Sequence, residues 1–182
     1  MKRRYAVILP FVLAGACSQA PAEERSNLPS GPVVDAADIL PEDEEASLDR
    51  QLRDWSVETG NSLVVSTVPT LGGRPIEDVA FEQFNGWGIG DSETDRGLLL
   101  LLAPNDRQVR IEVGCGLERV ITDAAAAEII QSDIIPAFRS GDMVGGVRQG
   151  TTALIRQTED KIANAEDGPL SSECLSNLKE AA

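Results

Sequence analysis

The sequence predicts an α/β domain in which a mixed sheet carries helices on both faces, and two observations support this. Helical and strand-like patterns alternate through the middle of the chain, which is typical of sheets covered by helices. Residues 98–102 are five consecutive leucines bounded by Gly97 and Pro104, a run typical of a central strand that is buried on both faces. A short buried helix is the alternative for this run. We expect the crossovers to be mostly right-handed.

Two helices and one strand are expected before the leucine run. The first helix begins at Pro41, where four acidic residues suit the positive end of the helix dipole, and it ends at Gly60. Residues 62–68 are rich in Val and Leu, which predicts a strand. A second helix begins at Pro75, and Gly86 and Gly88 end it.

A hairpin and further helices are expected after the leucine run. Residues 109–113 alternate apolar and charged side chains, which predicts a strand paired antiparallel to the leucines through a tight turn at 104–107. Thr122 is placed to cap a helix, and Pro136 kinks or restarts the chain. The last long helix begins at Gly141-Asp142.

The first residues have the pattern of a secretory signal. Three basic residues precede an apolar run, and small residues lead directly to Cys17. We therefore expect residues 1–16 to be a signal peptide and Cys17 to carry a lipid, because the pattern resembles the bacterial lipobox. An ordinary signal peptide with a chance cysteine is the alternative. We then expect residues 17–32 to form a flexible tether, and the protein to be an exported, membrane-anchored lipoprotein facing the periplasm or the cell exterior.

The acidic composition restricts the partners. The formal charge is −14, and without the three basic residues of the signal 13 basic residues face 30 acidic ones, which gives −17. Such a surface repels phosphate backbones, so we expect no nucleic-acid partner and membrane contact through the lipid alone. It suits divalent cations or basic partners.

The histidine and cysteine content restricts the kinds of catalysis, metal site and disulfide that are possible. The chain has no histidine, which excludes Ser-His-Asp and Cys-His catalysis and leaves oxygen ligands for any metal, such as Ca²⁺ or Mg²⁺. Cys115 and Cys174 remain after the lipid cysteine, and two cysteines in an oxidising compartment usually pair. Two free thiols, or a bridge to another chain, are the alternatives.

A candidate cation site follows from the predicted hairpin. Asp95 lies at the start of the leucine strand, and the hairpin returns residues 114–118 to that end. The expected ligands are Asp91, Asp95 and Glu118, with Asp123 at a helix start, and Asp35 if the first strand ends on that side. A solvated loop is the competing interpretation. Asp106 lies past the other end of the strand and is expected to cap its own turn.

A set of short motifs resembles the TPM domain over residues 31–160. The motifs occur in this order: Val34-Asp35, Trp87-Gly88-Ile89-Gly90, Asp95-Arg96-Gly97, Asn105-Asp106-Arg107, Glu112-Val113-Gly114-Cys115-Gly116-Leu117-Glu118, Thr122-Asp123 and Pro136 to Asp142. The resemblance implies a compact three-layer αβα sandwich over residues 33–163, followed by a polar tail at 164–182. It also implies divalent-cation binding in some members, acid-phosphatase activity in a plant thylakoid-lumen branch, and roles in maintaining membrane complexes.

This sequence departs from the family pattern at three points. Arg96 stands where the pattern has asparagine, Cys115 stands where an aromatic or other residue separates the two glycines, and no transmembrane segment follows the domain. We expect an N-terminal lipid to supply the membrane attachment instead.

Two functions are compatible with these residues. The first is a lipid-anchored binding module that takes a divalent cation and a protein partner in envelope or membrane-complex maintenance. The second is a metal-dependent acid phosphatase that uses the same acidic cluster, with Arg96 and Arg119 clamping phosphate. The first is favoured because the sequence supplies no evident nucleophile with an activating base.

Overall fold

The computed structural model describes residues 29–164 and residue 174, and it contains one four-stranded sheet in the order β1-β2-β3-β4. The strands are β1 (Val33–Asp35), β2 (Ser62–Thr67), β3 (Gly97–Ala103) and β4 (Gln108–Val113). The first three strands are parallel, and β4 pairs antiparallel with β3, so the predicted mixed sheet and its hairpin are confirmed. All seven residues of β3 are buried, so the leucine run is the central strand.

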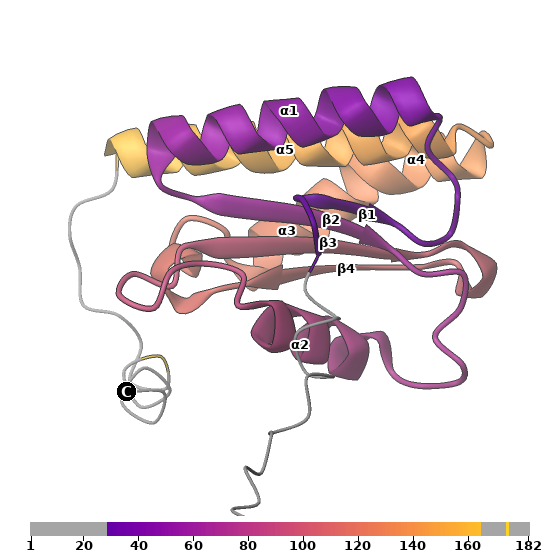
Figure 1. Cartoon of the computed structure of the whole chain (residues 1–182), viewed down its shortest axis with the longest axis horizontal. Helices are drawn as coiled ribbons and strands as arrows, with labels where there is room; N and C mark the ends of the chain where they lie inside the picture. The colour runs from indigo at the N-terminus through magenta and orange to yellow at the C-terminus, as the bar shows by residue number, and fades with distance from the viewer. Residues whose placement is uncertain (1–28, 165–173, 175–182) are drawn as a thin grey trace, which may run out of the picture.

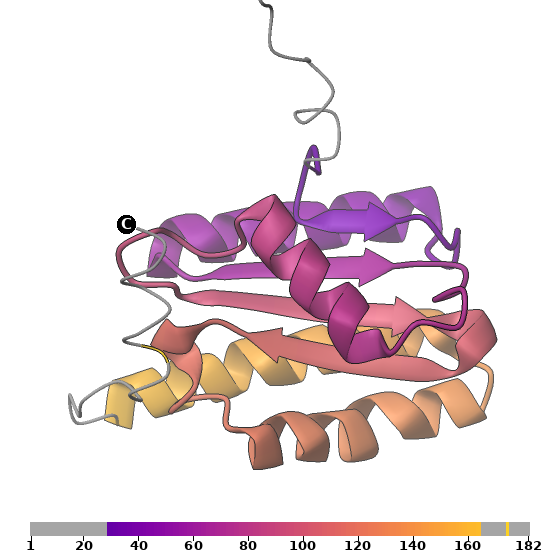
Figure 2. The ribbon, with the colours of Figure 1, turned by 90° about the horizontal axis from the view of Figure 1, so that it is seen from below.

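Helices cover both faces of the sheet, which makes the predicted αβα sandwich (Figure 1). Helices α1 (Glu42–Thr59) and α5 (Met143–Asn164) lie side by side on one face, where Trp55 Nε1 donates a hydrogen bond to Glu159 at 3.1 Å. Helix α2 (Ile76–Trp87) crosses the opposite face alone (Figure 2). Along β3 the leucines alternate between the two cores: Leu98, Leu100 and Leu102 face α1 and α5, while Leu99 and Leu101 face α2.

The two parallel crossovers have opposite hands. The chain moves in the same direction across the sheet from β1 to β2 and from β2 to β3. The connecting helices α1 and α2 nevertheless pack on opposite faces. One crossover is therefore left-handed, a rare arrangement that the expectation of mostly right-handed connections did not include.

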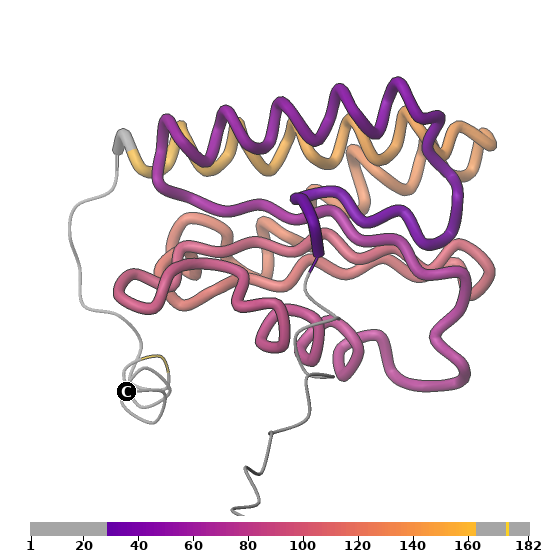
Figure 3. Tube along the Cα trace, viewed as in Figure 1, coloured from indigo at the N-terminus to yellow at the C-terminus, as the bar shows by residue number. Residues whose placement is uncertain are grey.

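The hairpin and the helices after it follow the sequence signals closely. The turn Pro104–Asp106 is a 3₁₀ turn that ends at Arg107, and Thr122 Oγ1 accepts a hydrogen bond from Ala125 N at 3.2 Å. Helix α3 (Asp123–Ile129) continues through a π-helical turn, Ile130–Ile134, into α4 (Ile135–Arg139), as the trace in Figure 3 shows. Pro136 lacks an N–H, so the chain changes its hydrogen-bond spacing at this point instead of ending the helix.

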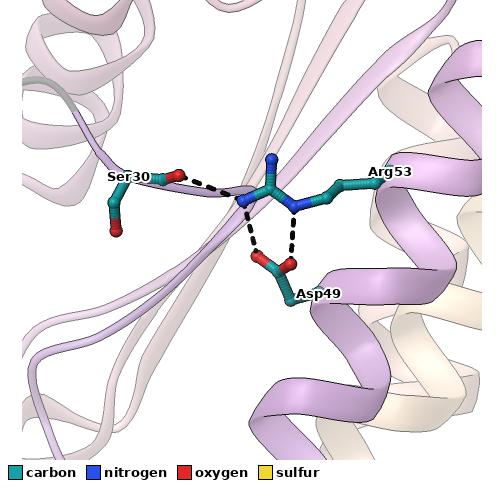
Figure 4. A network of polar contacts seen from close by, with 3 residues as sticks. All are labelled: Ser30, Asp49 and Arg53. Atoms are coloured by element: carbon teal, nitrogen blue, oxygen red, sulfur yellow. Dashed lines mark hydrogen bonds and ion pairs between the residues drawn. The ribbon is translucent and has the colours of Figure 1, made fainter.

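The segment that enters β1 is fastened to α1. Arg53 pairs with Asp49, with 2.6 Å between Nε and Oδ2, and its Nη2 donates to the carbonyl oxygen of Ser30 at 3.0 Å (Figure 4). Residues 29–32 thereby line one wall of a groove of about 500 Å³ beside α1 and the start of β2. The chain thus enters the sheet at its edge, beside the middle of β2, where Val33 pairs with Val65.

The expected signal peptide and lipidated Cys17 lie outside the described residues. Within 29–164, no helix has the length and apolar character needed to cross a bilayer.

Candidate functional site

Two loops, residues 89–96 before β3 and residues 114–118 after β4, meet at the end of the sheet where β3 begins. Glycines allow this loop pair to approach closely. A Cβ on Gly97 would overlap the carbonyl oxygen of Ile89 and lie 2.9 Å from Gly90 N. A Cβ on Gly114 would overlap the carbonyl oxygen of Asp95, and a Cβ on Gly116 would overlap that of Thr94. The glycines of these motifs are therefore explained by backbone packing, in which a side chain would separate the two loops.

Asp95 is a half-buried acidic group of this loop pair. Its backbone has φ of 47°, and its carboxylate Oδ2 accepts a hydrogen bond from Cys115 N at 2.8 Å. Its carbonyl oxygen accepts a second bond from Gly116 N at 3.0 Å. Burial raises the pKa of Asp95, and the neighbouring charge of Asp91 raises it further, although the Cys115 bond opposes both.

Asp91 organises the start of the same loop. Its carboxylate accepts hydrogen bonds from Glu93 N at 2.9 Å, from Thr94 N at 2.8 Å, and from the Thr94 hydroxyl. These bonds lower the pKa of Asp91 and keep it ionised, the Thr94 hydroxyl having the largest effect. Asp91 is thus an exposed carboxylate, held by hydrogen bonds, whose negative charge raises the pKa of Asp95.

The remaining predicted residues of this end are more peripheral. Glu118 follows the 3₁₀ turn η3 (Cys115–Leu117), and Asp123 is the first residue of α3; both are exposed, as is Arg119. Arg96 is half-buried, and its carbonyl oxygen accepts from Ser62 N at 2.9 Å. Among the described residues no three acidic or cysteine side chains are grouped closely enough to hold a metal ion. A cation here would need backbone carbonyls and water to complete its shell.

Asp35 lies at the opposite end of the sheet and does not join this group. It is paired with Thr67 at the ends of β1 and β2, whereas Gly97 is paired with the first residue of β2. Its carboxylate accepts hydrogen bonds from Leu40 N at 2.7 Å and from the Thr67 hydroxyl. The condition for including Asp35 among the ligands is therefore not met, because parallel strands place all their last residues at one edge.

Asp106 was expected to cap its own turn, and this was wrong. Its Oδ2 accepts from Leu71 N at 2.8 Å, so it joins the β3–β4 turn to the loop after β2. Sequence reasoning missed this contact because it depends on the tertiary approach of two loops, and it missed the Asp35–Thr67 pair because that pair depends on the strand register.

The predicted disulfide is confirmed. Cys115 and Cys174 are bonded across a sequence separation of 59, with their Cα atoms 5.3 Å apart. Cys174 is fully buried, so a residue of the polar tail is fixed beside the loop pair.

Comparison with known proteins agrees with this architecture. The model of the TPM domain matches residues 33–157, which is more than half of the chain. The chain belongs to the TPM domain family. No curated protein matches it.

Solved structures show the same fold. The N-terminal domain of a protein from P. gingivalis, solved by NMR, is 30% identical, with a TM-score of 0.68 over 76% of this chain and 88% of that one. The BA42 protein of the psychrophilic bacterium Bizionia argentinensis is 19% identical, with a TM-score of 0.58 over 67% and 83%. An N-terminal domain from Corynebacterium glutamicum is 18% identical, with a TM-score of 0.55 over 88% and 93%. The last two support the fold alone.

The Asp95→Asn variant of this TPM domain is expected to be more stable than the wild type at neutral pH. The folded-state pKa of Asp95 is raised, so its contribution to stability is complete below the unfolded-state pKa and is lost as pH rises through the folded-state pKa. Asparagine tolerates positive φ and can still accept from Cys115 N. Because water screens this half-buried group, the gain stays below about 1 kcal/mol. Urea unfolding at pH 3 and pH 7 measures it, and an advantage that is larger at pH 3 would contradict this assignment.

Proposed function

We propose that this TPM domain is a lipid-anchored binding module that takes a divalent cation, Ca²⁺ or Mg²⁺, at the Asp91–Asp95 loop and a protein partner in the cell envelope. The observation that carries the proposal is the half-buried Asp95 carboxylate beside the ionised Asp91. Such an arrangement costs free energy without a counter-ion, and a cation offsets that cost. The net charge of −14 favours cation approach.

Loop rigidity supports the same proposal. The close glycine contacts and the Cys115 hydrogen bond fix the Asp95 carboxylate before any ligand arrives. Preorganisation lowers the cost of ordering ligands, which matters for a site that has few carboxylates. With two anchored acids, and with Glu118 and Asp123 in the segment that follows η3, we expect a dissociation constant of roughly 10⁻⁴–10⁻³ M, typical of extracellular calcium modules.

Calorimetric titration with Ca²⁺ and Mg²⁺ tests the cation site. Asp95→Asn is expected to weaken binding at least tenfold, because it removes a charged ligand but keeps the backbone conformation. Asp35→Asn is the matched control, since the same change at the opposite end of the sheet should leave the affinity unaltered. Equal losses in both variants, or no heat at millimolar metal, would refute the proposal.

A metal-dependent acid phosphatase is the alternative proposal, and Arg96 is the feature that favours it. A Cβ on Gly116 would lie 2.8 Å from Arg96 Cγ, so the stem of this arginine runs beside the loop pair. Phosphate release from p-nitrophenyl phosphate, with and without added metal, separates the two functions. Turnover that needs metal and falls in Arg96→Gln would establish the enzyme and displace the binding module.

The proposed anchor makes a prediction of its own. Cys17→Ser is expected to release the protein from membranes or to block its processing, because the lipid is the only proposed membrane contact. Fractionation together with intact mass measures this. Unchanged fractionation and unchanged mass would show that Cys17 carries no lipid. A pulldown with the anchored form, compared with Asp95→Asn, addresses the envelope partner.

A further inference from the structure

The disulfide connects two parts of the chain that the fold otherwise leaves separate. Cys115 lies in η3, directly after β4, whereas Cys174 lies ten residues beyond Asn164, the last residue of α5. The bond places Cys174 at the end of the sheet that carries the Asp91–Asp95 loop, and Cys174 is fully buried there.

The hydrophobic cores are built without this bond. Within the described residues, the core on the α1 and α5 face and the core on the α2 face are formed by side chains between Val33 and Ile162, and neither includes a cysteine. The ladder β1-β2-β3-β4 is likewise formed by residues between Val33 and Val113. The bond therefore adds Cys174 to a sheet and two cores that the other described residues already form.

Cys115 is coupled through its backbone to Asp95. Its N–H donates to the Asp95 carboxylate, and the next N–H, from Gly116, donates to the Asp95 carbonyl oxygen. The flanking glycines leave no space between the two loops, since a Cβ on Gly114 would lie 2.9 Å from Asp95 Oδ1. A change in the position of residue 115 is thus transmitted to the Asp95 carboxylate.

We propose that Cys115–Cys174 is a redox latch on the Asp91–Asp95 loop: the disulfide form holds the loop in its binding geometry, and reduction releases Cys115 from Cys174 and loosens the loop. The consequence for cation affinity rests on the proposed function; the coupling of the loop to the bond does not. In the reducing step, a thiolate of an external dithiol attacks one sulfur and forms a mixed disulfide. The second thiol of the reductant then displaces the cysteine, so two electrons and two protons pass to Cys115 and Cys174 and the reductant leaves as a disulfide.

Amide hydrogen exchange on a soluble chain of residues 18–182, which contains every described residue, tests the latch directly. Reduction by dithiothreitol is expected to lower the protection of the Cys115 and Gly116 amides at least tenfold. Protection of the Leu71 amide, which donates to Asp106 at the other end of the sheet, is the internal control and should not change. Calcium affinity measured on the same samples should fall about fivefold on reduction.

Cys174→Ser separates the latch from side effects of the reductant. This variant leaves residue 115 unaltered, and it should reproduce the reduced state and show no response to dithiothreitol. Unchanged protection at Cys115 and Gly116 in both the reduced protein and the variant would overturn the proposal, as would equal loss at Leu71, which would mean that the bond holds the whole fold. A loss confined to Cys115 and Gly116, with no calcium binding in either form, would uphold the latch and refute the proposed cation site.

Discussion

Gly97→Ala is expected to destabilise the domain by about 3 kcal/mol, because the new methyl group would overlap backbone that cannot rotate away. Its Cβ would collide with the Ile89 carbonyl oxygen and would lie 2.7 Å from the Ile89 carbonyl carbon. Relief would require moving the loop of residues 89–96 away from β3, which would also displace Asp95. Urea unfolding measures the loss, and cation affinity should fall with it.

Gly86→Ala is the matched control for this glycine. Gly86 lies within α2, and a Cβ built there meets no atom within 4 Å. Alanine is the better helix former, so this change should raise stability by up to about 1 kcal/mol. A similar loss at both positions would show that the close approach at Gly97 does not matter.

Leu100→Ala is expected to cost about 3–5 kcal/mol. Leu100 is fully buried in the middle of β3 and belongs to the core shared with α1 and α5. Its Cδ2 lies 3.6 Å from where a Cβ of Gly150 would be, so α5 packs closely over it and the surrounding structure has little room to collapse into the cavity.

Val57→Ala provides the corresponding control on the surface. The Val57 side chain is 88% exposed on α1, so its truncation removes almost no buried area. The change should stay within about 0.5 kcal/mol. A cost at Leu100 no larger than that at Val57 would contradict the assignment of β3 as the central strand.

The fold was predictable because its signals are local. Pro41, Gly60, Pro75 and Gly88 mark helix ends in the sequence, and Gly60 and Gly88 adopt the left-handed conformation that ends α1 and α2. The leucine run between Gly97 and Pro104 indicates a strand buried on both faces, with a short buried helix as the alternative. The opposite hands of the two crossovers were not predictable, since the helical patterns do not say on which face of the sheet each helix packs.

The candidate site was predictable only in part. Cys115 and Gly116 contact Asp95 as the predicted hairpin required, because strand length and turn position follow from the sequence. Placing Asp35 required the direction and register of a three-residue strand, which no periodicity reveals in so short a segment. The hydrogen bond from Leu71 N to the Asp106 carboxylate likewise arises from the tertiary approach of two loops.

Amide NMR shifts during a Ca²⁺ titration of the oxidised chain test the central claim, that this TPM domain binds a cation at the Asp91–Asp95 loop. Each described loop carries its own amide probes, so the map locates binding without mutation. Shifts are expected to cluster at residues 91–96 and 114–118 and to saturate in the range of roughly 10⁻⁴–10⁻³ M. Shifts that cluster instead at Asp35, Thr67 and Asp106, or no shifts at millimolar metal, would contradict it.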